Sequence, residues 1–203
     1  MSTAQLGPTT ARGPTGETIE ENVSGELGLV PLTDDEYAAF VALQTKQIAR
    51  ERVIAGEWTA EEAAARAWDD AAQLRGDTLR GERHDFYRGV GFAGERIGWL
   101  WIAPAPDLVA GYGVADASRT RWLAQIIVEE ALRGQGHGRR LLVALHRRLA
   151  DEGVTDLFLR VYDWNLPAVR LYAACGYVLV NQFATDAHYR LRLPDDTRPG
   201  SGR

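Results

Sequence analysis

The amino-acid sequence predicts an α/β fold of the mixed, α+β kind, with one mostly antiparallel sheet and helices on both of its faces. Segments with the period of a strand and segments with the period of a helix follow one another in the order β-α-α-β-β-β-α-β-α-β-β. Residues 120–161 contain a strand, a helix and a second strand, and such a crossover places its two strands parallel, with a right-handed connection. The other strands read as antiparallel, so we expect a mixed sheet.

We expect one folded domain over residues 27–194, with a disordered tail on either side. A chain of 203 residues is long enough for such a domain to bury a full core. Residues 1–26 are rich in Gly, Pro, Thr, Ser and Glu and have almost no large apolar side chains, so they cannot offset the entropy cost of ordering. Residues 195–203 have the same character.

The domain is expected to open with a short strand and two helices. The strand covers Leu27 to Leu32, and the following residues 33–36, Thr-Asp-Asp-Glu, form a capping box that starts the first helix. The apolar stripe of this helix consists of Tyr37, Phe40, Val41 and Ile48. A second capping box at residues 59–62, Thr-Ala-Glu-Glu, starts an alanine-rich helix that runs to about Leu74.

Three strands follow these helices. Two of them, at residues 84–91 and 96–103, are joined at residues 93–95, Ala-Gly-Glu, as a hairpin. A connection that contains Pro and Gly leads to the third strand, at residues 120–129. This third strand is the first of the expected parallel pair.

The last part of the domain alternates helices with strands. The helix behind the third strand has an apolar face made of Leu141, Leu142, Leu145 and Leu149. Gly153 is placed to end it, and residues 157–161 form the next strand. Asn165 can cap a further helix, which has Pro167 in its first turn and ends at Gly176. The domain closes with two strands, Tyr177 to Phe183 and His188 to Leu193.

Composition and charge exclude several classes of protein. The chain is 45% hydrophobic and 25% charged, as in ordinary globular proteins, and its net charge of −5 argues against nucleic acid as a partner. Cys175 is the only cysteine, and the four histidines have no ligand spacing, so we expect neither a disulfide framework nor a metal site. No signal pattern and no apolar run of membrane-spanning length is present, so we expect a cytoplasmic protein without a membrane partner.

A glycine-rich loop connects the strand at 120–129 to the helix behind it. Its sequence over residues 133–138 is Arg-Gly-Gln-Gly-His-Gly. Glycines at every second position expose backbone N–H groups, and the first turn of a helix adds unpaired N–H donors and the positive end of the helix dipole. The loop therefore predicts an anion site suited to phosphate.

Two common phosphate-binding motifs do not fit this loop. A P-loop needs Lys followed by Ser or Thr after its last glycine, and neither dipeptide is present here. A dinucleotide-binding fingerprint has the spacing G-x-G-x-x-G, whereas this loop has G-x-G-x-G and comes late in the chain. What remains is Arg133-x-x-Gly136-x-Gly138 at a strand-to-helix junction.

This pattern, together with a second one, resembles the GNAT superfamily of N-acetyltransferases. The superfamily has Gln or Arg, then Gly, then Gly or Ala at the same spacing in the same place. About thirty residues later, residues 165–177 are similar to the second signature, N-x-x-A-x-x-L-Y-x-x-x-G-F/Y. The similarity extends over roughly residues 27–193 and implies the GNAT fold, with a parallel pair that splays apart.

The resemblance implies acetyl-CoA as co-substrate, without a metal. The pyrophosphate would lie on the loop, and the pantetheine would pair with the edge of the preceding strand. The residues implied for this binding are Ile126, Ile127, Val128, Arg133, Gly134, Gln135, Gly136, His137, Gly138, Arg139 and Asn165. Arg139 and its neighbour Arg140 could instead form a solvated helix face, and Asn165 could serve only as a helix cap.

Tyr172 is implied as the general acid that protonates the departing thiolate. From the residue pattern alone it could equally be a core aromatic side chain. The backbone N–H near Val128 is implied as donor to the oxyanion. Cys175 reads as a small packing residue and not as a nucleophile.

The general base is less well defined. Many members have Asp or Glu three residues before the valine that precedes the loop, but here Gln125 stands at this position and cannot titrate. Glu129 is our candidate base, with Glu130 at the same strand end as its alternative. His84 and Asp85, on an earlier strand, are more distant alternatives. Gln125 could orient the substrate or a water molecule.

The acceptor is expected to be a small-molecule amine or a protein amine, bound by the N-terminal helices and the hairpin. This region contains aromatic and acidic side chains that could hold a cation, although most of the aromatic residues also fit a core. They are Tyr37, Trp58, Trp68, Phe86, Tyr87, Trp99 and Trp101, with Asp69, Asp70 and Asp85.

The main hypothesis is an acetyl-CoA-dependent N-acetyltransferase that acts on a primary amine by direct attack. A CoA-binding module without catalysis is an alternative, favoured by Gln125 and disfavoured by Asn165 and Tyr172. A transferase that uses a longer acyl-CoA is a third hypothesis. The superfamily also makes a homodimer an expectation.

Overall fold

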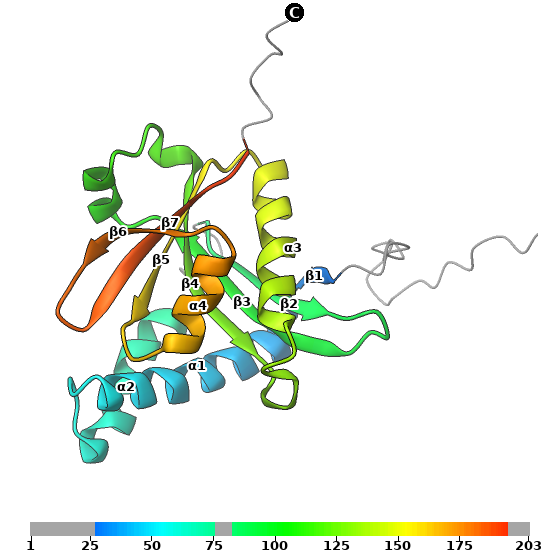
Figure 1. Ribbon diagram of the computed structural model, residues 1–203. Helices are drawn as coiled ribbons and strands as arrows, with labels where there is room; N and C mark the ends of the chain where they lie inside the picture. Colours follow the sequence, from blue (N-terminus) through cyan, green and yellow to red (C-terminus); the bar gives the residue numbers. More distant parts are fainter. Residues whose placement is uncertain (1–26, 76–82, 195–203) are drawn as a thin grey trace, which may run out of the picture.

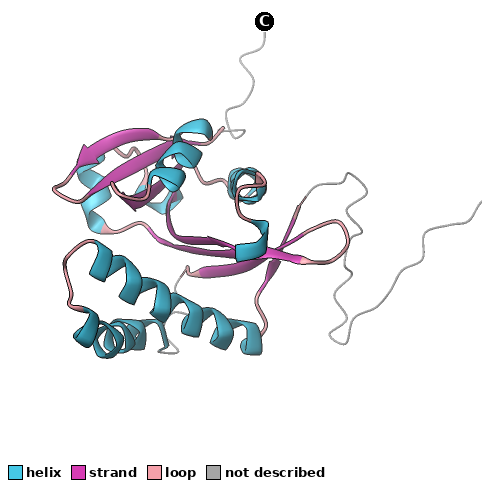
Figure 2. Cartoon of the chain, turned by 60° about the horizontal axis from the view of Figure 1, so that its bottom comes forward, coloured by secondary structure: helices cyan, strands magenta, loops and turns pink. Residues whose placement is uncertain are grey.

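The computed structural model describes residues 27–75 and 83–194, with side chains omitted for residues 70–75. The two predicted tails lie outside the described residues. The described part forms a seven-stranded sheet in the order β1-β2-β3-β4-β5-β7-β6. Helices α1 and α2 lie on one face of the sheet, and α3 and α4 lie on the other (Figures 1 and 2).

The strands occur in the predicted order, with small shifts at their ends. They are β1 (Gly28–Pro31), β2 (Asp85–Val90), β3 (Arg96–Pro104), β4 (Thr120–Val128), β5 (Asp156–Tyr162), β6 (Val178–Gln182) and β7 (Asp186–Arg192). All neighbouring pairs are antiparallel except β4 and β5, which are parallel. The predicted mixed sheet with one parallel pair is therefore confirmed.

The four α-helices also correspond to the predicted ones. They are α1 (Asp34–Ile54), α2 (Ala60–Arg75), α3 (His137–Asp151) and α4 (Leu166–Ala174). The capping box at the start of α1 is formed, because the Thr33 side chain accepts from the Glu36 backbone N–H and the Glu36 carboxylate accepts from the Thr33 N–H. Sequence reasoning left the connection before β4 and the end of β4 irregular, but they contain the short 3-10 helices η2 (Asp107–Tyr112), η3 (Ala117–Arg119) and η4 (Glu130–Leu132).

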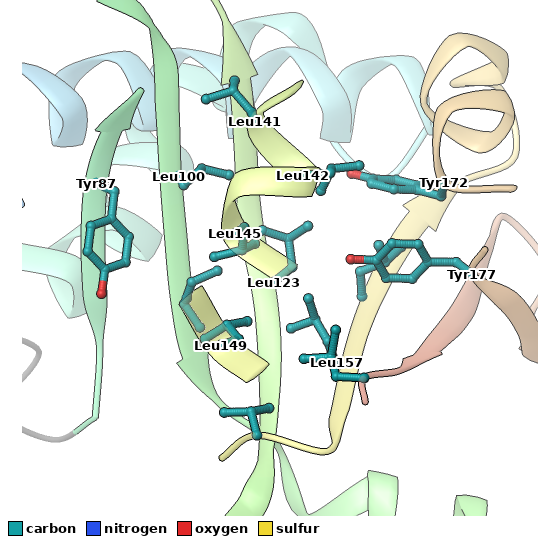
Figure 3. Packing of buried hydrophobic residues seen from close by; sticks show 14 of the residues in the cluster. Tyr87, Leu100, Leu123, Leu141, Leu142, Leu145, Leu149, Leu157, Tyr172 and Tyr177 are labelled. Carbon is teal, nitrogen blue, oxygen red and sulfur yellow. The ribbon is translucent and has the colours of Figure 1, made fainter. Parts of the chain in front are cut away.

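Each face of the sheet has its own apolar core. The four leucines predicted for the inner face of α3 are at most 1% exposed and pack against β4 and β5 (Figure 3). On the opposite face, Phe40 and Val41 of α1 pack against Phe86 and Trp99 of the hairpin strands. The sheet is thus covered on both sides, and the cores hold α1 and α3 in fixed places relative to β4.

Gly98 of β3 allows the close approach of β4 at the strand end that leads into the glycine loop. It lies opposite Val128, and a Cβ at this position would stand 2.1 Å from the Ile127 carbonyl oxygen. Because a backbone atom cannot rotate away, we expect Gly98→Ala to lower the free energy of unfolding by about 3 kcal/mol in urea denaturation. Gly111→Ala, with no atom within 4 Å of the added Cβ, should change it by less than about 0.5 kcal/mol. Equal effects of the two substitutions would show that the β3–β4 contact can widen freely.

Candidate active site

The parallel pair at the centre of the sheet is joined over only part of its length. β4 and β5 are in register from the pair Thr120–Asp156 to the pair Leu123–Leu159. Beyond Leu123, β4 continues to Val128 beside β3 alone, and the two parallel strands diverge toward α1 (Figure 1). The expected splay of this pair is therefore present.

A β-bulge in β4 lies where the splay begins. Trp101 of β3 faces Gln125 and the next residue, Ile102, faces Leu123, so Ala124 is the extra residue. Leu123 and Ile126 consequently pack in the same core beside α3, although they are three residues apart. The bulge thereby directs Gln125 to the opposite face of the sheet, toward α1.

The edge of β4 that faces the gap presents free backbone groups. The Glu129 N–H donates to the Ile97 carbonyl of β3 (2.9 Å), and hydrogen-bonded positions alternate along an antiparallel ladder. Ile126 and Val128 therefore direct their N–H and C=O groups away from β3, into the gap. The Val128 carbonyl accepts there from Arg133 Nε (3.1 Å), whereas the other groups have no strand partner within the described ranges. An extended ligand can pair with this edge like an added strand.

A cleft of about 1020 Å³ occupies the gap and reaches both faces of the sheet. It is lined by β4 and β5, by the glycine loop and the start of α3, by α4, and by the C-terminal half of α1. Most of the residues predicted from sequence line it together, namely Gln125, Ile126, Ile127, Val128, Arg133, Gly134, Gly136, His137, Gly138, Arg139, Asn165 and Tyr172. Gln135 and Glu129 are not among the described residues that line it.

The glycine loop forms an open cradle of N–H groups at the start of α3. Gly134 and Gly136 have φ values of 73° and 81°, a left-handed conformation that glycine adopts without strain. Gly136 is the N-cap and has no side chain to accept from the helix, so the first N–H groups of α3, from His137 to Arg139, remain available to a ligand. Gln135 does not line the cleft because its amide donates to the Ala131 carbonyl (2.9 Å) and braces the loop.

Gly138 has a packing role that sequence reasoning did not anticipate. A Cβ at this position would lie 3.0 Å from Leu171 Cδ2 and 3.7 Å from Val128 Cγ2. The glycine therefore lets the first turn of α3 approach both α4 and the end of β4. This contact brings the N–H cradle beside the free edge of β4.

Asn165 and Tyr172 bring α4 to the cleft. The Asn165 side chain accepts from the Ala168 N–H (3.3 Å), so it caps α4 and also lines the cleft. Tyr172 is 6% exposed, packs edge-to-face on Tyr177 at 5.5 Å, and has its oxygen end turned toward Leu142 of α3 (Figure 3). Its hydroxyl makes no hydrogen bond to a described residue.

The environment of Tyr172 keeps its hydroxyl protonated. Burial raises the pKa of Tyr172 well above its usual value, and the charge of Glu51 raises it further. The hydroxyl can thus act as a proton donor throughout the neutral pH range. Burial also raises the pKa of the neighbouring Cys175 thiol, which suits a packing residue.

The carboxylates expected as bases lie elsewhere. Glu129 is paired with Arg96 of β3 at 2.6 Å, and Glu130 is exposed at the start of η4. Asp85 forms an ion pair with Arg121. The His84 ring accepts from Trp101 Nε1 at 3.0 Å. None of these four groups is among the described residues that line the cleft.

Glu51 of α1 is a residue of this cleft that sequence reasoning missed. It is the only carboxylate among the described residues that line the cleft. Gln44, Gln47, Ile48 and Glu51 lie on one face of α1, at intervals of three and four residues, and all of them line the cleft. The predicted stripe of α1 ended at Ile48, but its continuation with polar residues was the signal for this site.

The acceptor-side aromatic residues divide between core and cleft. Tyr37, Phe86 and Trp99 belong to the core beneath α1, and Tyr87 lies in the other core. Trp58 lies under the Arg52 guanidinium, Trp68 is 60% exposed, and Asp69 is exposed. Asp70 lies outside the described side chains. Of the predicted set only Trp101 lines the cleft, where it is joined by Trp122, Tyr162 and Trp164.

Two features are absent from residues 27–75 and 83–194. In these ranges, no group of three or more His, Cys, Asp or Glu side chains is arranged to hold a metal ion. Within the same ranges, no helix has the length and apolar character needed to cross a membrane.

Residues 49–177, more than half of the chain, match the model of the acetyltransferase (GNAT) family. The chain belongs to the GNAT family. Among its relatives in this family, the uncharacterized N-acetyltransferase YdgE of Bacillus subtilis is 27% identical over 153 residues, which are 75% of this chain and 92% of YdgE. The predicted family and fold class are both confirmed.

Solved structures agree with this GNAT assignment. The crystal structure of YycN from Bacillus subtilis, also named as an uncharacterized N-acetyltransferase, matches with a TM-score of 0.68 at 25% identity and covers 78% of this chain and 96% of its own. The structure of yncA from Salmonella typhimurium, solved with its cofactor acetyl-CoA, has a TM-score of 0.58 at 15% identity and covers 87% and 99%. At such low identity, the match shows only that yncA and this chain share a fold.

Proposed function

We propose that this GNAT chain is an acetyl-CoA-dependent N-acetyltransferase that acts on a primary amine, with Tyr172 as the general acid. The observation that carries the proposal is that the N–H cradle of α3, the free edge of β4 and the Tyr172 side chain all line one cleft. The acetyl-CoA bound to yncA, which shares the fold, supports the choice of donor.

The cleft suits an anionic, extended donor. The N–H groups from Gly136 to Arg139 can bind the pyrophosphate, and the dipole of α3 favours its negative charge. The free N–H and C=O groups of Ile126 can pair with the amides of the pantetheine arm. Arg139 adds positive charge beside the cradle, whereas Arg140 does not line this cleft. Acetyl-CoA supplies the acetyl group as a thioester.

The remaining groups fit direct acyl transfer. The lone pair of a neutral amine forms a bond to the acetyl carbonyl carbon, and the Val128 N–H stabilises the negative oxygen. The carbon–sulfur bond then breaks, and its electron pair stays on sulfur. The Tyr172 hydroxyl gives its proton to this sulfur and regains one from the new amide nitrogen, so that the products are the free thiol and the N-acetyl amide.

Thiol release from acetyl-CoA in the presence of a panel of primary amines tests this proposal. Steady release that depends on an amine, with the N-acetyl product found by mass spectrometry, is the expected result. Saturable CoA binding without turnover on any amine would instead identify a CoA-binding module. A transferase for longer acyl groups would turn over butyryl-CoA faster than acetyl-CoA with the same amine.

A further inference from the structure

The face of α1 that covers the sheet changes character along the helix. Its first half contributes Phe40 and Val41 to the core beneath α1. The same face continues with Gln44, Gln47 and Glu51, which line the cleft. Polar side chains on the buried face of a helix carry a desolvation cost, which a ligand can offset by bonding to them.

Two of these side chains have features that fit a bound amine. Gln44 is 5% exposed, and its Oε1 atom is buried without a hydrogen-bond partner among the described residues. An N–H donor from a ligand would satisfy this oxygen. Gln47 donates to Glu51 Oε1 at 2.7 Å and so holds the carboxylate in place within the cleft.

We propose that Glu51 is the general base that removes the proton from the acceptor ammonium. This inference rests on the proposed function and names the group that prepares the amine. The Glu51 carboxylate takes one proton from the ammonium nitrogen and leaves the neutral amine, whose lone pair then attacks the acetyl carbon. Glu51 later releases the proton to solvent.

The electrostatic surroundings of Glu51 suit this role. Burial raises the pKa of Glu51, while the Gln47 hydrogen bond and the charges of Arg160 and Arg52 lower it, with a net rise. The other groups that face Glu51 are Tyr162 of β5 and Tyr172 of α4. A base with a raised pKa takes up a proton at a higher pH, and proton transfer is most efficient when the pKa of the base lies near the working pH. Glu51 and Tyr172 both line the cleft, and the charge of Glu51 contributes to the raised pKa of Tyr172.

The charge distribution restricts the acceptor as well. Among the described residues that line the cleft, Glu51 is the single acid, whereas Arg50, Arg52, Arg133, Arg139 and Arg160 are basic. Arg52 and Arg160 are paired with Glu57 and Asp186, and Arg133 and Arg139 lie at the donor end, so Glu51 offers the acceptor a single negative site. The acceptor that fits is therefore a monoamine, and Trp101, Trp122 and Trp164 favour an apolar or aromatic body.

The test compares two acceptors of similar shape, phenethylamine and O-benzylhydroxylamine. The first is a charged ammonium at pH 7 and needs a base, whereas the second is already neutral. For Glu51→Gln we expect kcat/KM to fall about 100-fold with phenethylamine and less than about 3-fold with O-benzylhydroxylamine. In the unaltered chain, kcat/KM for phenethylamine should rise with pH as Glu51 loses its proton. Glu51→Gln should abolish this rise, whereas Glu51→Asp should retain it.

Glu57→Gln is the matched control. Glu57 contacts Arg52, Arg160 and Tyr162 beside the cleft but is not among its lining residues, so the ratio of the two rates should stay unchanged. Because burial opposes the charge of Glu51, Glu51→Gln should not lower the melting temperature. Equal losses with both acceptors, or no loss, would overturn the role of Glu51. If the unaltered chain acetylates another amine of the panel but neither probe, the apolar monoamine acceptor is overturned, whereas no turnover with any amine overturns the proposed function.

Discussion

Gly136→Asp is expected to weaken CoA binding about 1,000-fold in isothermal titration calorimetry. Gly136 caps α3 with a φ of 81°, and its surroundings leave an open space where an added side chain would stand at the N–H cradle. A carboxylate there would lie against the pyrophosphate of CoA bound as proposed. Two unit charges about 4 Å apart near a protein surface repel by roughly 4 kcal/mol, and this energy corresponds to about three powers of ten in Kd.

Gly136→Asn separates the effect of charge from that of shape. Asn and Asp have nearly the same size, and both tolerate the left-handed conformation better than other side chains. The Asn variant should therefore lose less than about 10-fold in affinity. If the two variants bound CoA equally well, the cradle would not be where the pyrophosphate lies.

Tyr172→Phe is expected to lower kcat about 1,000-fold, within the range that general acid catalysis contributes. The hydroxyl makes no hydrogen bond to a described residue, so its removal should leave the melting temperature nearly unchanged. The Kd for CoA should also stay the same, because the ring that packs against Tyr177 is retained. Steady-state thiol release with one amine, together with thermal unfolding, measures these effects.

Tyr177→Phe provides the control for this experiment. The Tyr177 hydroxyl is hydrogen-bonded to His146 Nε2 at 3.0 Å, and burial lowers the pKa of His146 to about 4, so that its ring is neutral near pH 7. Loss of this hydrogen bond should cost about 1 kcal/mol in stability and leave kcat unchanged. A similar loss of kcat in both variants would assign the effect of Tyr172→Phe to packing and would argue against a general acid.

The order of the elements and the two signatures could be predicted because local patterns encode them. The capping box at Thr33 and the leucine face of α3 depend on residues three and four apart, and both are formed as expected. Gly134 and Gly136 have positive φ angles, a conformation that favours glycine, and glycine at both positions is visible in the sequence. The structure brings most of the predicted donor-binding residues together at one cleft.

The acceptor half could not be predicted in the same way. The stripe of α1 continues to Glu51 with polar residues, but only the packing of α1 across the splayed strands brings this face to the cleft. The place of Glu129 beside the loop predicts a base, yet Glu129 is paired with Arg96 of the neighbouring strand and is not among the described residues that line the cleft. The bulge at Ala124 depends on the pairing of β4 with β3, which also lies outside the reach of sequence periodicity.

The extra residue in β4 makes the length of this strand as important as its composition. Side chains on an ideal strand alternate between the two faces, and a change of one residue exchanges the faces for everything beyond it. Because Ala124 is the extra residue, its deletion would remove the bulge and restore regular alternation, with Leu123 still opposite Ile102 and Gln125 still opposite Trp101. Insertion of one residue between Gln125 and Val128, where no bulge absorbs it, would instead exchange the faces of the strand end beyond it.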